Sequence, residues 1–364
     1  MAVPLFDTST PLAPLRERLH ERALAVMDAG RYILGPEVSA FESEFAGWIG
    51  AGHAVGVANG TDALTLALLA LGVGPGDEVV VPSFTFYASA EAIPPTGARP
   101  VVCDVDPDTM CVTALTVRAA LTPRTKAVIA VDLFGNVAPN EEIEALGVPV
   151  LEDAAQAIGG SRNGRAAGSF GTAATLSFFP SKNLGAFGDA GAVATDDDAV
   201  AERVRMLRFH GSRDKQTFEL VGRNSRLDEL QAALLRVQLP ELDGWAAARR
   251  AVAREYAEAG LGELVALPAP VAGAEPAWHL YVVRSAQAEA LEAALNAAGI
   301  GARRYYTVPV HRQPAMAGVA PGLELPMTDE LARTNLALPM SPALRAEQVA
   351  EVVASVRACA SGST

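Results

Sequence analysis

The chain has 364 residues, half of them apolar, and a formal net charge of −13 from 29 basic and 42 acidic residues. This length and apolar content suffice for one large domain and a smaller one. The acidic excess, without a basic stripe, argues against nucleic-acid binding, although locally converging arginines would still allow an anionic substrate.

The three cysteines are widely spaced and lack metal-ligand spacing. They favour a reducing compartment and predict neither a disulfide framework nor a metal site. No signal peptide opens at Met1, and no apolar run approaches the length of a membrane span. We therefore expect a cytoplasmic protein that does not associate with a membrane.

The first 209 residues alternate between helix-like and strand-like segments. Helical spacing predicts two amphipathic helices over 12–29 and 37–49, with Gly30 ending the first and Pro36 starting the second. Seven strands follow, over 53–58, 78–81, 100–102, 126–131, 148–151, 173–179 and 192–195, with helices over 61–71, 86–93 and 197–209. This alternation predicts an α/β domain with a mostly parallel sheet covered on both faces. Ligands of such sheets bind beyond the carboxyl ends of the strands.

The rest of the chain predicts a second, smaller unit. A polar loop over 210–223 leads to long helical periodicity over 227–258, interrupted near Pro240. A strand over 280–283 and helices over 286–298 and 343–358 follow. We predict a large domain over 1–245 and a small α+β C-terminal domain over 246–364.

The stretch around Lys182 organises the candidate site. Lys182 leaves a predicted buried strand and enters a loop that contains Gly185, Gly188 and Gly191. Desolvation lowers the pKa of an ammonium group, and an imine-forming lysine needs a neutral amine. A lysine in a loop is more often simply solvated, so this interpretation depends on the ends of the other strands.

Two other strand ends have the chemistry of a phosphate site. Gly60, Thr61 and Asp62 follow a strand and open a helix, so they offer free backbone N–H groups, a positive dipole end and a hydroxyl. Ser177 adds a second hydroxyl five residues before Lys182. A simple helix cap and a structural serine remain open as alternatives.

Three further residues suit a flat, charged ring. Asp153 ends a strand, where its carboxylate could pair with a protonated ring nitrogen, and Gln156 shares its face if a helix starts there. Phe86 follows another strand and could stack on the ring. Each has an ordinary reading as a cap or as core packing. Together with Lys182 and the phosphate donors, they form the set that a pyridoxal phosphate (PLP) enzyme needs.

These motifs resemble those of the DegT/DnrJ/EryC1/StrS family of PLP-dependent nucleotide-sugar aminotransferases. The resemblance covers nearly the whole chain, through segments 32–36, 58–64, 76–79, 82–86, 152–157, 177–191, 224–233, 278–281 and 309–314. It implies the PLP-dependent transferase fold type I, which is the aspartate aminotransferase fold.

The resemblance also implies roles for matching positions. Lys182 would hold the cofactor as a Schiff base and move protons, and Asp153 would pair with the ring nitrogen. The other cofactor contacts would be the phosphate ligands Gly60, Thr61, Asp62 and Ser177, the ring-stacking Phe86, and Gln156 at the ring hydroxyl. Asn224 would cross to the partner's phosphate, which implies a homodimer with shared sites. Substrate would meet Tyr306, His311, Arg226 and Phe179.

The implied reaction is a two-stage, ping-pong transamination. L-glutamate would give its amino group to the cofactor, and a nucleoside-diphosphate ketosugar would then accept it. We expect dTDP as the carrier, with carbon 3 slightly favoured over carbon 4. Relatives often have other residues at Asp132, Phe134, Phe179, Tyr305 and Thr307, positions that the resemblance assigns to the sugar side or its surroundings. The sugar itself therefore stays open.

Three alternatives remain. The first is a glutamine-dependent aminocyclitol aminotransferase, and the second is a PLP-dependent sugar dehydratase. The dehydratases replace the lysine by histidine, so Lys182 weighs against them. The third is a non-catalytic regulator that kept the fold, which the intact cofactor set opposes.

Overall fold

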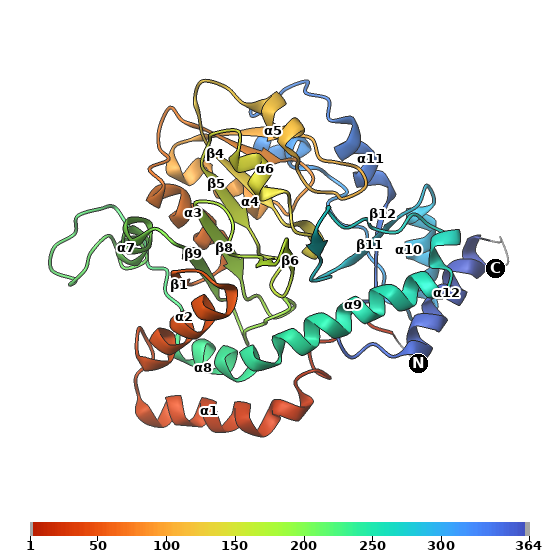
Figure 1. Cartoon of the computed structure of the whole chain (residues 1–364), viewed down its shortest axis with the longest axis horizontal. Helices are drawn as coiled ribbons and strands as arrows, with labels where there is room; N and C mark the ends of the chain where they lie inside the picture. The colour runs from red at the N-terminus through yellow and green to blue at the C-terminus, as the bar shows by residue number, and fades with distance from the viewer. Residues whose placement is uncertain (1–2, 361–364) are drawn as a thin grey trace.

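The structure, a computed structural model, describes residues 3–360 of the chain (Figure 1). Met1 and Ala2, and the last four residues of the predicted C-terminal domain, lie outside these described residues.

A seven-stranded sheet forms the centre of the molecule (Figure 1). Its strands are β1 (His53–Val57), β2 (Glu78–Pro82), β3 (Arg99–Cys103), β4 (Thr125–Val131), β5 (Val150–Asp153), β8 (Ala173–Ser177) and β9 (Gly191–Thr195). They lie in the order β1-β9-β8-β5-β4-β2-β3. Only β9 runs antiparallel to its neighbours. The predicted mostly parallel sheet of seven strands is therefore confirmed.

Helices cover both faces of this sheet. The first eight are α1 (Arg16–Ala29), α2 (Pro36–Ile49), α3 (Gly60–Ala70), α4 (Ala88–Glu91), α5 (Ala114–Ala120), α6 (Asn140–Glu144), α7 (Asp198–Leu207) and α8 (Glu229–Gln238). On β9, Val193 packs into the core cluster that contains residues of α3 and α7, whereas Ala192 and Ala194 pack into the cluster with α2 and α8. Successive side chains of a strand point to opposite faces, so the two clusters are the two sides of one sheet.

A second assembly lies beyond the sheet, at the far end of the long helix α9 (Leu242–Glu258) (Figure 1). It contains the antiparallel pair β11 (Tyr281–Arg284) and β12 (Asn335–Leu338), with α10 (Ala288–Ala297), α11 (Pro326–Thr334) and α12 (Ala346–Ala360). Its core cluster includes Val3 from the start of the chain. The predicted domain boundary at residue 245 falls within α9 and stays a prediction.

The sequence analysis missed several short elements. It predicted neither α11 nor β12, nor the small sheet of β6 (Ser161–Arg162), β7 (Arg165–Ala166) and β10 (Ala274–Glu275). The helix predicted over 86–93 is only the single turn α4, followed by a 3-10 turn over Pro94–Thr96. These elements are short and depend on partners distant in sequence, such as β11 for β12, so local periodicity carries little signal for them.

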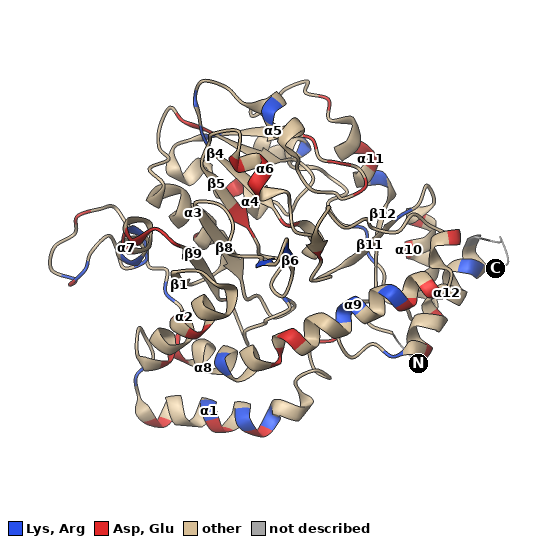
Figure 2. Ribbon diagram, viewed as in Figure 1, with Lys and Arg blue, Asp and Glu red and all other residues tan. Residues whose placement is uncertain are grey.

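Charged residues lie mainly on outer surfaces, and both signs alternate along α1 and α9 (Figure 2). Within residues 3–360, no helix is long and apolar enough to cross a membrane.

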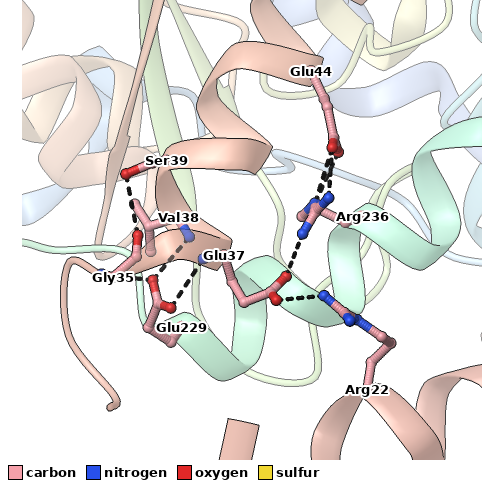
Figure 3. A network of polar contacts seen from close by, with 8 residues as sticks. All are labelled: Arg22, Gly35, Glu37, Val38, Ser39, Glu44, Glu229 and Arg236. Atoms are coloured by element: carbon pink, nitrogen blue, oxygen red, sulfur yellow. Dashed lines mark hydrogen bonds and ion pairs between the residues drawn. The ribbon is translucent and has the colours of Figure 1, made fainter. Parts of the chain in front are cut away.

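A buried carboxylate from α8 fixes the start of α2 (Figure 3). Glu229 accepts hydrogen bonds from the N–H groups of Gly35 at 2.7 Å, Glu37 at 3.0 Å and Val38 at 2.9 Å. A helix leaves its first N–H groups without partners inside the helix, and an anion there is favoured by the helix dipole. Glu229 therefore anchors α2 to α8 across nearly two hundred residues of sequence.

Glu229→Gln should lower the free energy of unfolding by about 2–3 kcal/mol, because an amide group cannot accept these bonds as the carboxylate does. Chemical denaturation measures this change as a lower midpoint. Asp228→Asn is the matched control, since exposed Asp228 makes no side-chain cap bond, and it should change stability by less than about 0.5 kcal/mol. Equal stability of the wild type and Glu229→Gln would contradict this role.

Candidate active site

A cavity of about 830 Å³ opens at the carboxyl ends of β1, β2, β5 and β8. Parallel strands end at the same edge of a sheet, so residues distant in sequence meet there. The cavity brings together most of the predicted site residues, namely Gly60, Thr61, Phe86, Asp153, Gln156, Ser177, Phe179, Lys182 and Tyr306. Asp62, Asn224, Arg226 and His311 are not among its lining residues.

Lys182 lies in the loop after β8, where its N–H donates to Phe179 O at 2.8 Å. Burial of the amine lowers the pKa of Lys182 to about 8, although the nearby Asp153 carboxylate acts in the opposite direction. A substantial fraction of Lys182 is therefore neutral close to physiological pH, which suits a nucleophile and a proton carrier.

Asp153 ends β5 and is buried. Its Oδ2 accepts a hydrogen bond from Ser89 Oγ at 2.7 Å, and its Oδ1 accepts one from Ala155 N–H at 3.2 Å. Burial raises the pKa of Asp153, whereas these two hydrogen bonds and the charge of Lys182 lower it. Burial is the largest of these effects and leaves the pKa of Asp153 above its usual value, while the donors offset part of this rise and Ser89 fixes the orientation of the carboxyl group.

The amino end of α3 forms a compact cradle. Asn59 caps the helix by accepting from Asp62 N–H at 2.8 Å, and Asn59 O accepts from Ala63 N–H. The helix therefore presents the N–H groups of Gly60 and Thr61 to the cavity. A Cβ on Gly60 would lie only 2.8 Å from the Cβ of Ser177, so glycine permits the close approach of the Ser177 hydroxyl.

Gln156 reaches the cavity from a turn rather than from the helix considered in the sequence analysis. Its Oε1 accepts from Phe134 N–H at 2.8 Å, and its Nε2 donates to Tyr306 Oη at 3.1 Å. The Tyr306 ring stacks on Phe134 at 5.7 Å between centroids, with an interplanar angle of 3°. This network holds Tyr306 against the strand ends. Phe86 and Phe179 are the exposed aromatics of the lining, at 57% and 52%.

His311 is buried behind the wall rather than on it. Its Nδ1 lies 2.6 Å from Ser83 Oγ, and Val310 N–H donates to Ser83 O at 3.0 Å. Val310 lines the cavity, so His311 fixes the wall from outside. Burial is the largest cause lowering the pKa of His311, which favours a neutral ring.

Asn224 and Arg226 lie away from the cavity, in the segment that leads into α8. Asn224 is exposed, and the Arg226 guanidinium lies 6.0 Å from the Phe209 ring centroid. The preceding loop, which follows α7, projects from the body of the molecule (Figure 1). Neither residue contributes to the cavity of its own chain.

The family resemblance placed Asp132 and Phe134 at or near the sugar side, and the structure places both behind the cavity lining rather than on it. Asp132 is fully buried outside the cavity lining, and its Oδ1 accepts from Ala138 N–H at 2.8 Å. Burial and the neighbouring Glu152 carboxyl group raise the pKa of Asp132 well above its usual range, which favours its protonated form. Phe134 supports Tyr306 from behind, whereas Phe179, Tyr305 and Thr307 do line the cavity.

Some lining residues escaped the sequence analysis, among them Ser89, Ser181, His279, Arg303 and Arg304. Ser181 directly precedes Lys182, so its hydroxyl was a signal available in the sequence. His279 reaches the cavity because the turn before β11 is fastened to the segment after β4. Ala277 N–H donates to Gly135 O at 2.8 Å, and a Cβ on Gly135 would lie 2.6 Å from Trp278 N. No local pattern predicts such a contact.

The comparisons with known proteins agree with this geometry. Residues 14–357 match the model of the DegT/DnrJ/EryC1/StrS aminotransferase family. The chain is 46% identical over 362 residues to dTDP-3-amino-3,4,6-trideoxy-alpha-D-glucose transaminase of Streptomyces venezuelae, covering 98% of this chain and 95% of that protein. The chain belongs to the DegT/DnrJ/EryC1/StrS aminotransferase family.

Two further members of the family support the match. One is UDP-N-acetyl-3-dehydro-alpha-D-glucosamine 3-aminotransferase of Acidithiobacillus ferrooxidans, 44% identical over 98% of this chain and 97% of that protein. The other is the crystal structure of Streptomyces venezuelae DesV in complex with a ketimine intermediate. It superposes with a TM-score of 0.95 at 45% identity, covering 99% of this chain and 98% of that one.

The protein is therefore a PLP-dependent nucleotide-sugar aminotransferase with the fold of these enzymes. The cavity fits PLP on its own chemistry. A helix terminus and the Ser177 hydroxyl suit a phosphate, the buried Asp153 carboxylate suits a ring cation, and Lys182 supplies an amine of lowered pKa. Among residues 3–360 no group of three or more histidine, cysteine or acidic side chains is placed to hold a metal ion.

Acylation of the apo-protein tests the acid–base behaviour of Lys182. Only the neutral amine reacts with acetic anhydride, so the rate at Lys182 should reach half its maximum near pH 8 rather than near the ordinary lysine value of about 10.4. Mass spectrometry of the Lys182 peptide measures this rate, with the exposed Lys126 as internal reference. Asp153→Asn should move the midpoint lower, because the Asp153 carboxylate raises the pKa of Lys182. A wild-type midpoint above pH 10 would contradict the assignment.

Proposed function

We propose that this enzyme transfers the amino group of L-glutamate to carbon 3 of a ketosugar carried on dTDP, with Lys182 as the reactive amine. The observation that carries the proposal is the shared cavity of Lys182 and Asp153, which holds an amine and a carboxylate at one sheet edge. The names of two relatives, from S. venezuelae and A. ferrooxidans, both specify position 3 of a nucleotide-linked sugar, which supports carbon 3 over carbon 4.

Bound PLP supplies an electron sink that stabilises negative charge at the substrate carbon. In this proposal Asp153, whose orientation is held by Ser89, would keep the cofactor's ring nitrogen protonated. Lys182 Nζ would take a proton from the donor carbon and later give a proton back, so that this amine would serve as both base and acid. The lowered pKa of Lys182 makes both directions accessible near neutral pH.

The remaining cofactor contacts follow the walls of the cavity. The N–H groups of Gly60 and Thr61 and the Ser177 hydroxyl bind the phosphate, with Asp62 completing the first turn of α3. Phe86, whose ring is exposed, stacks on the cofactor ring, and Gln156 Nε2 contacts its hydroxyl group beside Tyr306. Each assignment uses a residue type that already faces the space in question, apart from Asp62.

The sugar side is proposed to consist of aromatic and polar residues of the cavity lining. Tyr306, Phe179 and Tyr305 line it, and His311 positions it through Ser83 and the neighbouring Val310. Exclusion of water by these rings would protect the reacting carbon from hydrolysis. Tyr306 is the best placed to contact the sugar, since its hydroxyl already accepts from Gln156.

We further propose a homodimer with shared active sites. Asn224 is exposed, lies outside the cavity of its own chain and follows the projecting loop after α7 (Figure 1). Phe218 and Val221 in this loop are 58% and 97% exposed, so the loop offers apolar surface to a second chain. Asn224 would donate to the partner's cofactor phosphate, with Arg226 nearby to meet the partner's substrate.

Amine transfer to a panel of ketosugars tests the proposed reaction. The panel contains 3-keto and 4-keto sugars on dTDP and on UDP and one cyclitol ketone, with L-glutamate or L-glutamine as donor, and Lys182→Arg as the inactive control. We expect the dTDP-linked 3-keto sugar with glutamate to give the highest kcat/KM. Preference for a 4-keto sugar would overturn the carbon assignment. Preference for glutamine with an aminocyclitol ketone would replace the proposal by its alternative.

Asn224→Ala tests the shared site. This change should weaken PLP affinity by about tenfold, the effect of one lost charge-assisted hydrogen bond, without changing the oligomeric state. Fluorescence titration of the apo-protein and analytical ultracentrifugation measure the two quantities. Gln216→Ala is the matched control, since Gln216 is an exposed residue of the same projecting loop. Unaltered cofactor affinity in Asn224→Ala, or a monomeric wild type, would remove the cross-subunit assignment.

A further inference from the structure

Arg303 lines the active-site cavity from the segment between α10 and α11. Both backbone polar groups of Arg303 are hydrogen-bonded to Ala337. Arg303 N–H donates to Ala337 O at 3.2 Å, and Ala337 N–H donates to Arg303 O at 2.9 Å. Its guanidinium carbon lies 5.3 Å from the centroid of the Tyr305 ring, which also lines the cavity. The position of the Arg303 guanidinium therefore depends on β12 and on the Tyr305 ring.

The charge of Arg303 is not neutralised within the chain. Arg304, the next residue, pairs with Glu292 at 2.9 Å and with Glu289 at 3.6 Å. For Arg303, no carboxylate of residues 3–360 lies within the 4 Å that defines an ion pair. The charge of Arg303 acts on Tyr305 in the cavity lining. It lowers the pKa of Tyr305, although burial raises that pKa by more. Arg304 is thus held by ion pairs within the chain, whereas the guanidinium of Arg303 is available to a ligand.

The depth of Arg303 in the cavity indicates which part of a ligand it would meet. Asp153, at the reacting end, is only 5% exposed, whereas Arg303 is an exposed residue. Arg303, Thr307 and Val308 are exposed residues of the same lining, so this segment lies at an open end of the cavity, away from the buried Asp153 carboxyl group. A substrate with its keto carbon at Lys182 would extend its anionic tail toward that open end.

We propose that Arg303 binds the diphosphate of the nucleotide sugar at the mouth of the active site. This inference rests on the proposed function, which assigned no residue to the diphosphate. A guanidinium presents parallel N–H donors that match phosphate oxygens in a bidentate manner, and it is more weakly hydrated than an ammonium. Stacking on Tyr305 leaves the edge of the guanidinium free to donate.

Carboxylates are the other anions that this reaction class could bring to Arg303. In L-glutamate or a uronic sugar, the carboxylate belongs to the same molecule or ring as the carbon that reacts at Lys182. Such a carboxylate would therefore lie nearer the buried end of the cavity than Arg303 does. The diphosphate is separated from the reacting carbon by part of the sugar ring, and it carries more charge. The open end of the cavity therefore favours the diphosphate.

The experiment measures binding of free dTDP and of thymidine to the PLP-loaded enzyme by calorimetry. Arg303→Gln should raise the Kd for dTDP on the order of tenfold while leaving that for thymidine unchanged, and Arg303→Lys should fall between. Arg304→Gln is the matched control, since that cation is already held by Glu292, and it should bind dTDP as the wild type does. The wild-type affinity for dTDP should also fall with added salt more steeply than that of Arg303→Gln.

Kinetics of the two half-reactions separate the possible sources of the anion. In the Arg303→Gln enzyme the spectral change produced by L-glutamate alone should keep its wild-type rate and concentration dependence, while the KM for the nucleotide ketosugar rises. A weakened glutamate half-reaction with unchanged dTDP affinity would overturn the assignment, as would equal losses in Arg303→Gln and Arg304→Gln. If the wild type binds dTDP but aminates no ketosugar, the proposed function fails and the dTDP titrations still decide the role of Arg303.

Discussion

The site depends on an amine and a carboxylate that share one buried space. Removing charged groups from water costs free energy, and in this pair each group has a feature that reduces the cost. Lys182 becomes a weaker base, with a pKa of about 8, and Asp153 is stabilised by the Ser89 hydroxyl and by Ala155 N–H. A cofactor with a cationic ring and an aldehyde satisfies both groups at once, which explains why such a pair survives in a folded protein.

Backbone close approaches bring the rest of the site to this pair. Gly60 lets Ser177 contact the start of α3, and a Cβ on Gly191 would lie 2.5 Å from the carbonyl carbon of Asn59. Gly135, with φ of +99°, lets the turn at Trp278 and His279 approach the end of β4. At each of these points a side chain would force two segments apart. The positions of the phosphate cradle and of the substrate wall are thus set by the absence of side chains as much as by their presence.

The two ends of the cavity come from different parts of the chain, and this division matches the chemistry. Sheet edges and the start of α3 provide the proposed cofactor contacts, where a rigid frame would fix the reacting atoms. The wall of residues 303–308 is tied to β12 through Arg303 and Ala337, and it presents the side chains that face the variable part of the substrate.

The sequence by itself determined the alternation of strands and helices and the mostly parallel sheet, and it predicted that Lys182, Asp153 and the start of α3 meet in one site. Those features are encoded locally, by hydrophobic period, by glycines after a strand and by polar residues at strand ends. Only the tertiary structure decided that Ser89 orients Asp153, that Asp132 is buried beside Glu152, and that Arg303 has no carboxylate partner among residues 3–360 while the adjacent Arg304 is paired. Each of these depends on contacts between residues far apart in the chain, whose partners follow from packing and not from spacing.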